Sequence, residues 1–113
     1  MQGALQEAEL QNAILSARAN RAELQAIEAQ AWWQDTLSKI WVASGLDGSE
    51  ATHLAASYRI SAEQAPILDR ARRDGVETTI QAAHKAYQEY NYQLANQLMV
   101  AAYIVNSEHV RTP

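Results

Sequence analysis

Apolar residues recur at helical spacing through most of the chain. From Ala4 to Ala43 there is neither proline nor glycine, and Ala, Leu, Gln, Glu and Arg, which favour helix, dominate. A stretch with two glycines and two serines follows at 44–49, and helical patterning returns beyond it. We therefore predict an all-α protein with a long helix at about 4–43, a turn at 44–49, a short helix at about 49–58 and a second long helix at about 62–106.

The first long helix carries two apolar stripes. One consists of Leu10, Ile14, Ala17, Leu24, Ile27 and Ala31, and the other of Leu15, Ala19, Ala22, Ala26, Ala29 and Trp33. A surface helix usually has a single apolar stripe, so two stripes rich in alanine indicate close neighbours on both sides. The alternative is an ordinary helix with alanines on its outer face.

Turn and capping residues divide the chain. Gly45 and Gly48 can take left-handed backbone geometry, and Asp47 or Ser49 can cap the short helix that follows. Ser61 and Gln64 fit a capping box at the start of the second long helix, although Pro66 favours a start nearer Gln64.

The second long helix has one weak point, at Gly75, where we expect a kink or a short break. Beyond it an apolar seam continues at spacings of three or four: Val76, Ile80, Ala83, Tyr87, Tyr90, Leu94, Leu98, Ala101 and Val105. A helix of about 30 residues is roughly 45 Å long, which predicts an elongated hairpin of two long helices with a short helix at the connection. We expect one helical domain over 1–113 whose copies assemble side by side.

Composition narrows the range of functions. The 113 residues have a net charge of −4, which argues against a grip on a phosphate backbone because that needs clustered Lys and Arg. The absence of cysteine excludes disulfides and thiolate metal sites. No stretch approaches the roughly 18 to 20 apolar residues that span a bilayer, and Met1 to Leu10 lack the pattern of a signal peptide.

Candidate chemistry is sparse. None of His53, His84 and His109 has a second His at the helical spacing of a metal pair. No serine lies in a Gly-x-Ser-x-Gly context, and no glycine-rich loop with a following lysine opens a helix. We predict no enzyme activity, no cofactor and no metal.

Three groups of side chains are candidates for contacts with other molecules. Trp32, Trp33 and Trp41 either close the end of the hairpin together or leave one tryptophan free for a lipid or subunit contact. The basic group formed by Arg70, Arg72 and Arg73 is nearly balanced by its acidic neighbours, which favours a solvated or salt-bridged turn over a phosphate contact. We interpret Tyr87, Tyr90, Tyr92 and Tyr103 as packing residues and not as a base-stacking platform, because no basic groove accompanies them.

The order of these parts resembles the small internal virion proteins, or DNA-ejection proteins, of short-tailed bacteriophages. Two segments carry the resemblance: an Ala/Gln/Arg-rich helix from Ser16 to Val42 that leads into Ala43-Ser44-Gly45-Leu46-Asp47-Gly48-Ser49, and Asp69 to Glu77 leading into Tyr87 and a Gln/Ala-rich stretch. The resemblance covers roughly 16–102 and contains no catalytic residue.

The resemblance implies a structural virion protein. Such proteins lie inside the capsid near the portal, leave with the genome, and assemble in the host envelope into a channel for DNA. It implies a homo-oligomer, contacts with portal, tail or other ejection proteins, and passing DNA without sequence-specific binding. Family members usually begin with an apolar segment that can insert into a membrane, whereas Met1 to Glu7 is polar here, which argues against membrane insertion and leaves membrane contact as an open alternative.

A small helical-hairpin binding module, either a secretion-type protein or an assembly chaperone in the cytoplasm, is the alternative. As interface residues we propose Ala19, Ala22, Ala26, Ala29, Trp33, Tyr87, Leu94 and Leu98, and as turn or hinge residues Gly45, Gly48 and Gly75. In both readings the function depends on contacts between proteins.

Overall fold

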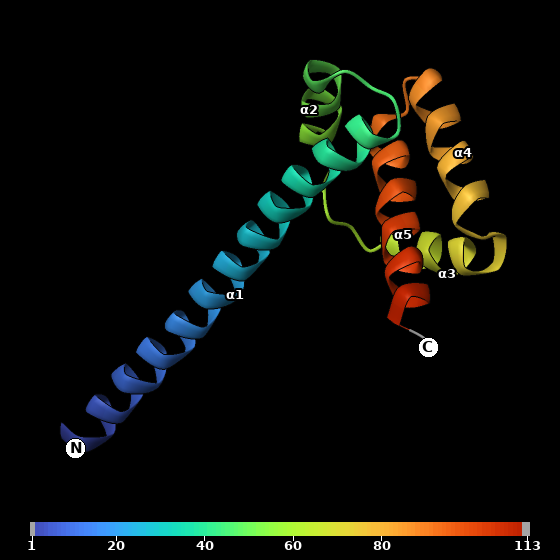
Figure 1. Cartoon of the computed structure of the whole chain (residues 1–113). Coiled ribbons are helices and arrows are strands. Elements are labelled where there is room, and N and C mark those ends of the chain that lie inside the picture. Colours follow the sequence, from blue (N-terminus) through green and yellow to red (C-terminus); the bar gives the residue numbers. More distant parts are fainter. Residues whose placement is uncertain (1, 112–113) are drawn as a thin grey trace. The chain divides into compact units, whose positions relative to one another are not determined.

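The computed structural model describes the backbone of residues 2–111 and the side chains of residues 21 and 23–110. Within the described backbone there are five helices and no strand (Figure 1). The helices are α1 (Gln2–Ala43), α2 (Gly48–Ala56), α3 (Gln64–Asp74), α4 (Val76–Gln88) and α5 (Tyr92–Arg111). The prediction of an all-α protein is confirmed.

The chain divides into two units, Met1–Ala31 and Trp32–Pro113. The described part of the first unit is helical throughout and belongs to α1. The second unit contains the end of α1 and the other four helices, and α5 packs against both α4 and α3 (Figure 1). A single helix has no second element of its own to pack against, so an enclosed core forms only in the second unit.

The core of the second unit is built around buried Leu37 and Trp41 from α1, Leu54 from α2, and Met99 and Val100 from α5. Small residues such as Ala51, Ala83 and Ala95 are fully buried between these large side chains. A smaller cluster of Ala71, Ala101 and Val105 joins α3 to α5. Alanines at these positions let the helix backbones approach closely, which offsets the shortage of large aromatic side chains.

A buried chain of hydrogen bonds runs through this core. The indole Nε1 of Trp41 donates to Asn96 Oδ1 over 2.9 Å, and Asn96 Nδ2 donates to the carbonyl oxygen of Leu54 over 2.8 Å. Trp41 and Asn96 are both fully buried. The pair of bonds therefore joins α1, α5 and α2 without leaving a polar atom of the amide or the indole unpaired.

Amide side chains also hold the segment that joins α2 to α3. Gln34 Nε2 donates to the carbonyl oxygens of Ala56 and Tyr58. Gln93 accepts from the Arg59 backbone N–H and donates to the Arg59 carbonyl oxygen. These glutamines satisfy backbone groups that have no helical partner, which keeps an irregular connection in one conformation.

The turn after α1 forms much as the sequence predicts. Gly45 has φ +115, and the N–H of Leu46 donates to the carbonyl oxygen of Trp41, which closes the helix end. Asp47 caps α2, since its Oδ1 accepts from the Glu50 N–H at 2.8 Å. The expectation of left-handed geometry at Gly48 is wrong, because Gly48 is the first residue of α2 and has no positive φ.

The predicted long helix at 62–106 is three helices, so the elongated hairpin of two long helices is not confirmed. Of the two expectations at Gly75 the short break is confirmed, because Gly75 separates α3 from α4, with φ +92 and ψ 163. The capping box at Ser61 does not form: α3 begins at Gln64, and the Ser61 hydroxyl accepts from Gln97 Nε2 instead.

A second break, at 89–91, was not predicted. Tyr90 has φ +62, its N–H donates to the Tyr87 carbonyl oxygen, and the Asn91 N–H donates to that of Ala86. This is a Schellman ending with tyrosine in the position that glycine usually takes. Asn91 Oδ1 then accepts from the Leu94 N–H at 3.4 Å and starts α5. Tyr90 was expected on the apolar seam, but it is 82% exposed because the helix ends before it.

Replacement of Asn96 tests the buried hydrogen-bond chain. In Asn96→Leu, the Trp41 N–H and the Leu54 carbonyl lose their buried partner, and we expect the free energy of unfolding to fall by about 2–4 kcal/mol. Asn106→Leu makes the same change at an exposed position of α5 and should stay within about 0.5 kcal/mol of the unchanged protein. Urea unfolding followed by circular dichroism measures both, and equal effects would contradict this role for Asn96.

Replacement of glycines tests the break between α3 and α4. An alanine at Gly75 must take a backbone conformation that L residues rarely adopt, and we expect Gly75→Ala to cost about 1–3 kcal/mol. Gly48→Ala is the matched control, because Gly48 is helical and an added Cβ there meets no atom within 4 Å. It should be neutral or slightly stabilising in thermal unfolding. A neutral Gly75→Ala would show that the chain can continue the helix there.

Candidate interaction groove

Three aromatic side chains gather where the last turns of α1 meet α5. The rings of Trp32 and Trp33 lie 4.9 Å apart between centroids in an edge-to-face arrangement. Tyr103 of α5 lies 5.8 Å from Trp33 and 6.4 Å from Trp32, again with steeply inclined planes. Each pair falls in the range in which aromatic rings attract one another, so the three rings hold one another in place.

An open groove of about 420 Å³ lies beside these rings. It is lined by Trp32, Trp33, Tyr103, Ile104, Ser107 and Glu108. Trp32 is 53% exposed and Tyr103 is 37% exposed, whereas Trp41, farther along α1, is fully buried. Of the two alternatives for the tryptophans, the exposure of Trp32 agrees with the one that leaves one tryptophan outside the core.

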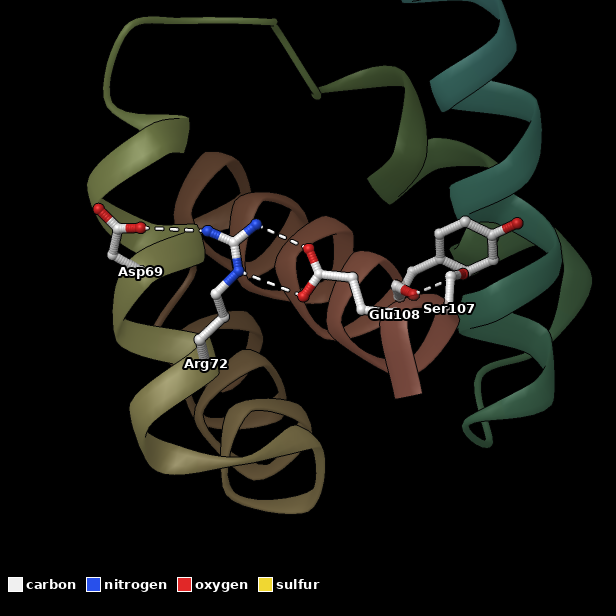
Figure 2. Close-up of polar contacts among 5 residues, drawn as sticks. Asp69, Arg72, Ser107 and Glu108 are labelled. Atoms are coloured by element: carbon white, nitrogen blue, oxygen red, sulfur yellow. Dashed lines mark hydrogen bonds and ion pairs between the residues drawn. The ribbon is translucent and has the colours of Figure 1, made fainter. Parts of the chain in front are cut away.

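An ion-pair network borders the groove (Figure 2). The Arg72 guanidinium of α3 binds the Glu108 carboxylate of α5 with two hydrogen bonds, Nη2 to Oε1 at 2.7 Å and Nε to Oε2 at 3.2 Å. Its third nitrogen, Nη1, donates to Asp69 Oδ1 at 3.2 Å. Parallel bonds of this kind fix the orientation of both side chains.

The network shifts the titration of its members. The hydrogen bond from Arg72 holds the pKa of the Glu108 carboxyl below its ordinary value, and the nearby positive charge adds to this. The hydrogen bond to Glu108 likewise raises the pKa of Arg72. The groove is therefore bordered by an ionised carboxylate with a fixed orientation.

This arrangement is suited to binding. Exposed tryptophan and tyrosine rings offer large apolar faces that lose little conformational freedom on contact, and they are enriched at protein interfaces. The Ser107 hydroxyl donates to the Tyr103 carbonyl oxygen at 3.0 Å, an ordinary bond within the helix (Figure 2). We interpret the groove as a contact surface for another macromolecule.

The proposed interface residues are distributed over different environments. The side chains of Ala19 and Ala22 lie outside the described residues, and Ala26 and Ala29 are exposed. Trp33 is half-buried in the aromatic cluster.

The three interface residues proposed in the second half of the chain belong to the packing of the second unit. Leu98 is buried at 7% exposure, and Leu94 packs against the core. Tyr87 also packs there, and its hydroxyl reaches Glu50 Oε2 at 3.5 Å. Burial and the nearby Glu50 charge raise the pKa of Tyr87.

Two arginines of the basic group, Arg70 and Arg72, form salt bridges, and the group lies in α3 and not in a turn. Arg70 pairs with Asp74 at 3.3 Å, and Arg72 pairs with Asp69 and Glu108. Among the described side chains no group of three or more His, Asp or Glu could hold a metal ion. A search of the described helices found none long and apolar enough to cross a membrane.

Sequence reasoning missed Tyr103, Ile104 and Glu108 as partners of the tryptophan pair. Their spacing within α5 carries a signal, since Ile104 and Glu108 are four residues apart and share a helix face. The sequence contains no comparable signal for the register between α5 and α1.

Comparison of the chain with protein families, with curated proteins and with solved structures gave no match.

The ion pair generates a pH prediction. Because the pKa of Glu108 is lower in the folded than in the unfolded chain, its contribution to stability is present above the unfolded pKa and is lost as the pH falls through the folded pKa. In Arg72→Gln we expect the Glu108 pKa, followed by NMR, to move up toward the ordinary value of 4.5. When the pH is lowered through the interval between the folded and unfolded pKa of Glu108, the melting temperature of Arg72→Gln should fall less than that of the unchanged protein.

Arg70→Gln is the matched control for this measurement. It removes the same charge from α3, but Arg70 pairs with Asp74 and not with Glu108. The Glu108 pKa should stay where it is. An unchanged pKa in Arg72→Gln would contradict the assignment of Arg72 as its cause.

Proposed function

We propose that this chain is a structural, self-assembling protein, specifically an internal virion protein of the DNA-ejection class. One observation carries the self-assembly: Leu24 and Ile27, neighbours on α1, are 57% and 64% exposed. The first unit has no second element that could cover them. When another molecule covers large apolar side chains grouped on one helix face, their removal from water lowers the free energy and favours binding.

The second stripe of the same helix supports contacts on more than one side. Ala26 and Ala29 are exposed and lie on a different face from Leu24. A ring or tube of repeated subunits needs each copy to present different patches to its two neighbours. Two distinct faces on one helix meet this requirement.

The charge of the chain suits a conduit for DNA. A net charge of −4 gives weak repulsion of phosphate, which favours passage of DNA over binding. In this proposal the protein lies in the virion interior, contacts the portal, tail or other ejection proteins, and enters the host envelope with the genome. The specific assignment to ejection proteins rests on the resemblance in sequence pattern.

A small binding module is the second candidate, and the aromatic groove favours it. Trp32 and Tyr103 offer a ready surface for a helix or peptide from a client protein, as a secretion-type protein or an assembly chaperone requires. In this case the protein acts as a monomer or dimer in the cytoplasm and needs a second protein for function.

Native mass separates the two candidates. We expect sedimentation or light scattering across a hundredfold concentration range, with and without lipid vesicles, to give a closed species of many 12.5 kDa copies. A native mass of a monomer or dimer that changes neither with concentration nor with lipid would reject self-assembly into a ring or tube and favour the binding module.

Ala26→Glu tests the alanine stripe in the same assay. A carboxylate in a close helix contact is costly, so we expect assembly to weaken at least tenfold while the helix content stays constant. Gln25→Glu adds the same charge one residue away, off the stripe, and should assemble normally. Normal assembly of Ala26→Glu would remove the alanine stripe from the interface.

A further inference from the structure

Four described residues form one patch on the first unit. Arg21, Leu24 and Glu28 follow each other at spacings of three and four, and Ile27 lies three residues beyond Leu24, so all four share one side of α1. Leu24 and Ile27 are 57% and 64% exposed, and Arg21 and Glu28 are exposed as well. The patch therefore combines two large apolar side chains with one charge of each sign.

This patch is complementary to the same patch on a second, antiparallel copy of the chain. If a second α1 lies alongside in the opposite direction, with a two-fold axis between residues 25 and 26, Leu24 of each copy faces Ile27 of the other. On one flank of this contact Arg21 of each copy lies nearest to Glu28 of the other, two residues or about 3 Å out of level along the helix. The apolar contact and the ion pair therefore each occur twice.

The charges select this direction over the parallel one. In a parallel, in-register pair Leu24 would face Leu24 and Ile27 would face Ile27, and the flanking positions would bring Glu23 of one copy to Glu28 of the other. That places like charges together twice and leaves Arg21 without an acidic partner across the contact. Only the antiparallel pair matches opposite charges.

We propose that two copies of this chain bind each other through an antiparallel pairing of α1 over about residues 20–31, with Leu24 against Ile27 and Arg21 against Glu28. The occupant of the patch is a second copy because the patch supplies its own complement in apolar residues and in charge. This inference rests on the proposed self-assembly and specifies its first step, an isologous dimer from which larger assemblies are built.

Charge reversal tests the pairing on the full chain. In Glu28→Arg the antiparallel dimer acquires two Arg–Arg contacts, and we expect its dissociation constant, measured by sedimentation, to rise about tenfold or more. Arg21→Glu should weaken it similarly, and the combination of both substitutions should restore it. In a parallel pair Glu28→Arg would instead gain two contacts with Glu23 and strengthen the dimer, which would overturn the proposal.

Gln25→Arg is the control variant, since it adds a positive charge at a neighbouring helix position that faces away from the pairing. It should leave the dissociation constant within about twofold. Helix content by circular dichroism checks that each variant still folds.

Introduced thiols give an independent reading, because the chain has no cysteine of its own. We expect a mixture of Leu24→Cys and Ile27→Cys chains to form a direct disulfide between unlike chains, while Leu24→Cys alone does so poorly, because a disulfide requires Cβ atoms about 3.5–4.5 Å apart. Efficient crosslinking of Leu24→Cys with itself would indicate the parallel pair. Assemblies of many copies that are indifferent to all these changes would reject the pairing but keep self-assembly, and a monomer at every concentration would reject both.

Discussion

The second unit depends on one buried amide. Asn96 sits on α5 with no exposed surface, accepts from the Trp41 indole and donates to the Leu54 carbonyl. A buried polar group without a partner costs more free energy than a normal hydrogen bond contributes, so these three groups must remain together or be exposed together. The apolar core alone would tolerate several relative positions of alanine-rich helices. The hydrogen-bond chain selects one, because only one register places the indole, the amide and the carbonyl within reach.

The groove follows from that register. Trp41 fixes the end of α1 against α5, and Trp33 lies eight residues earlier on α1 and Tyr103 seven residues after Asn96 on α5, each about two turns along its helix. The aromatic contacts at the groove are thus set by the buried bond two turns away. Arg72 and Glu108 add a tie between α3 and α5 at the border of the groove. That ion pair is exposed, so it contributes more to orientation than to stability.

Local signals predict the all-α class, the first long helix, the turn and the short helix, but not the division of the second half into three helices. The helix at 4–43 and the cap at Asp47 follow from propensity and from the side-chain oxygen that the first turn of α2 needs. The break at 89–91 was missed because a tyrosine takes the left-handed position where glycine is the usual signal, although Asn91 is a recognisable helix cap. Without that break, the sequence predicts a single long helix in the second half, where the structure has shorter helices that fold back on one another. Of the groove, the tryptophans could be singled out from sequence, but Tyr103 and Glu108 could not, since their place depends on how α5 packs.

The two units meet the physical requirements of folding in different ways. In the second unit every described buried side-chain nitrogen or oxygen has a hydrogen-bond partner, and its large apolar residues are mostly enclosed. The first unit is a stretch of helix, and an isolated helix in water gains little from its hydrogen bonds alone, because most helical stability in proteins comes from packing an apolar face. Leu24 and Ile27 supply such an apolar face, and the charged side chains of Arg21 and Glu28 flank it. A contact with a second molecule that covers these residues would therefore also stabilise the helix, because it would pack the apolar face that an isolated helix leaves in water.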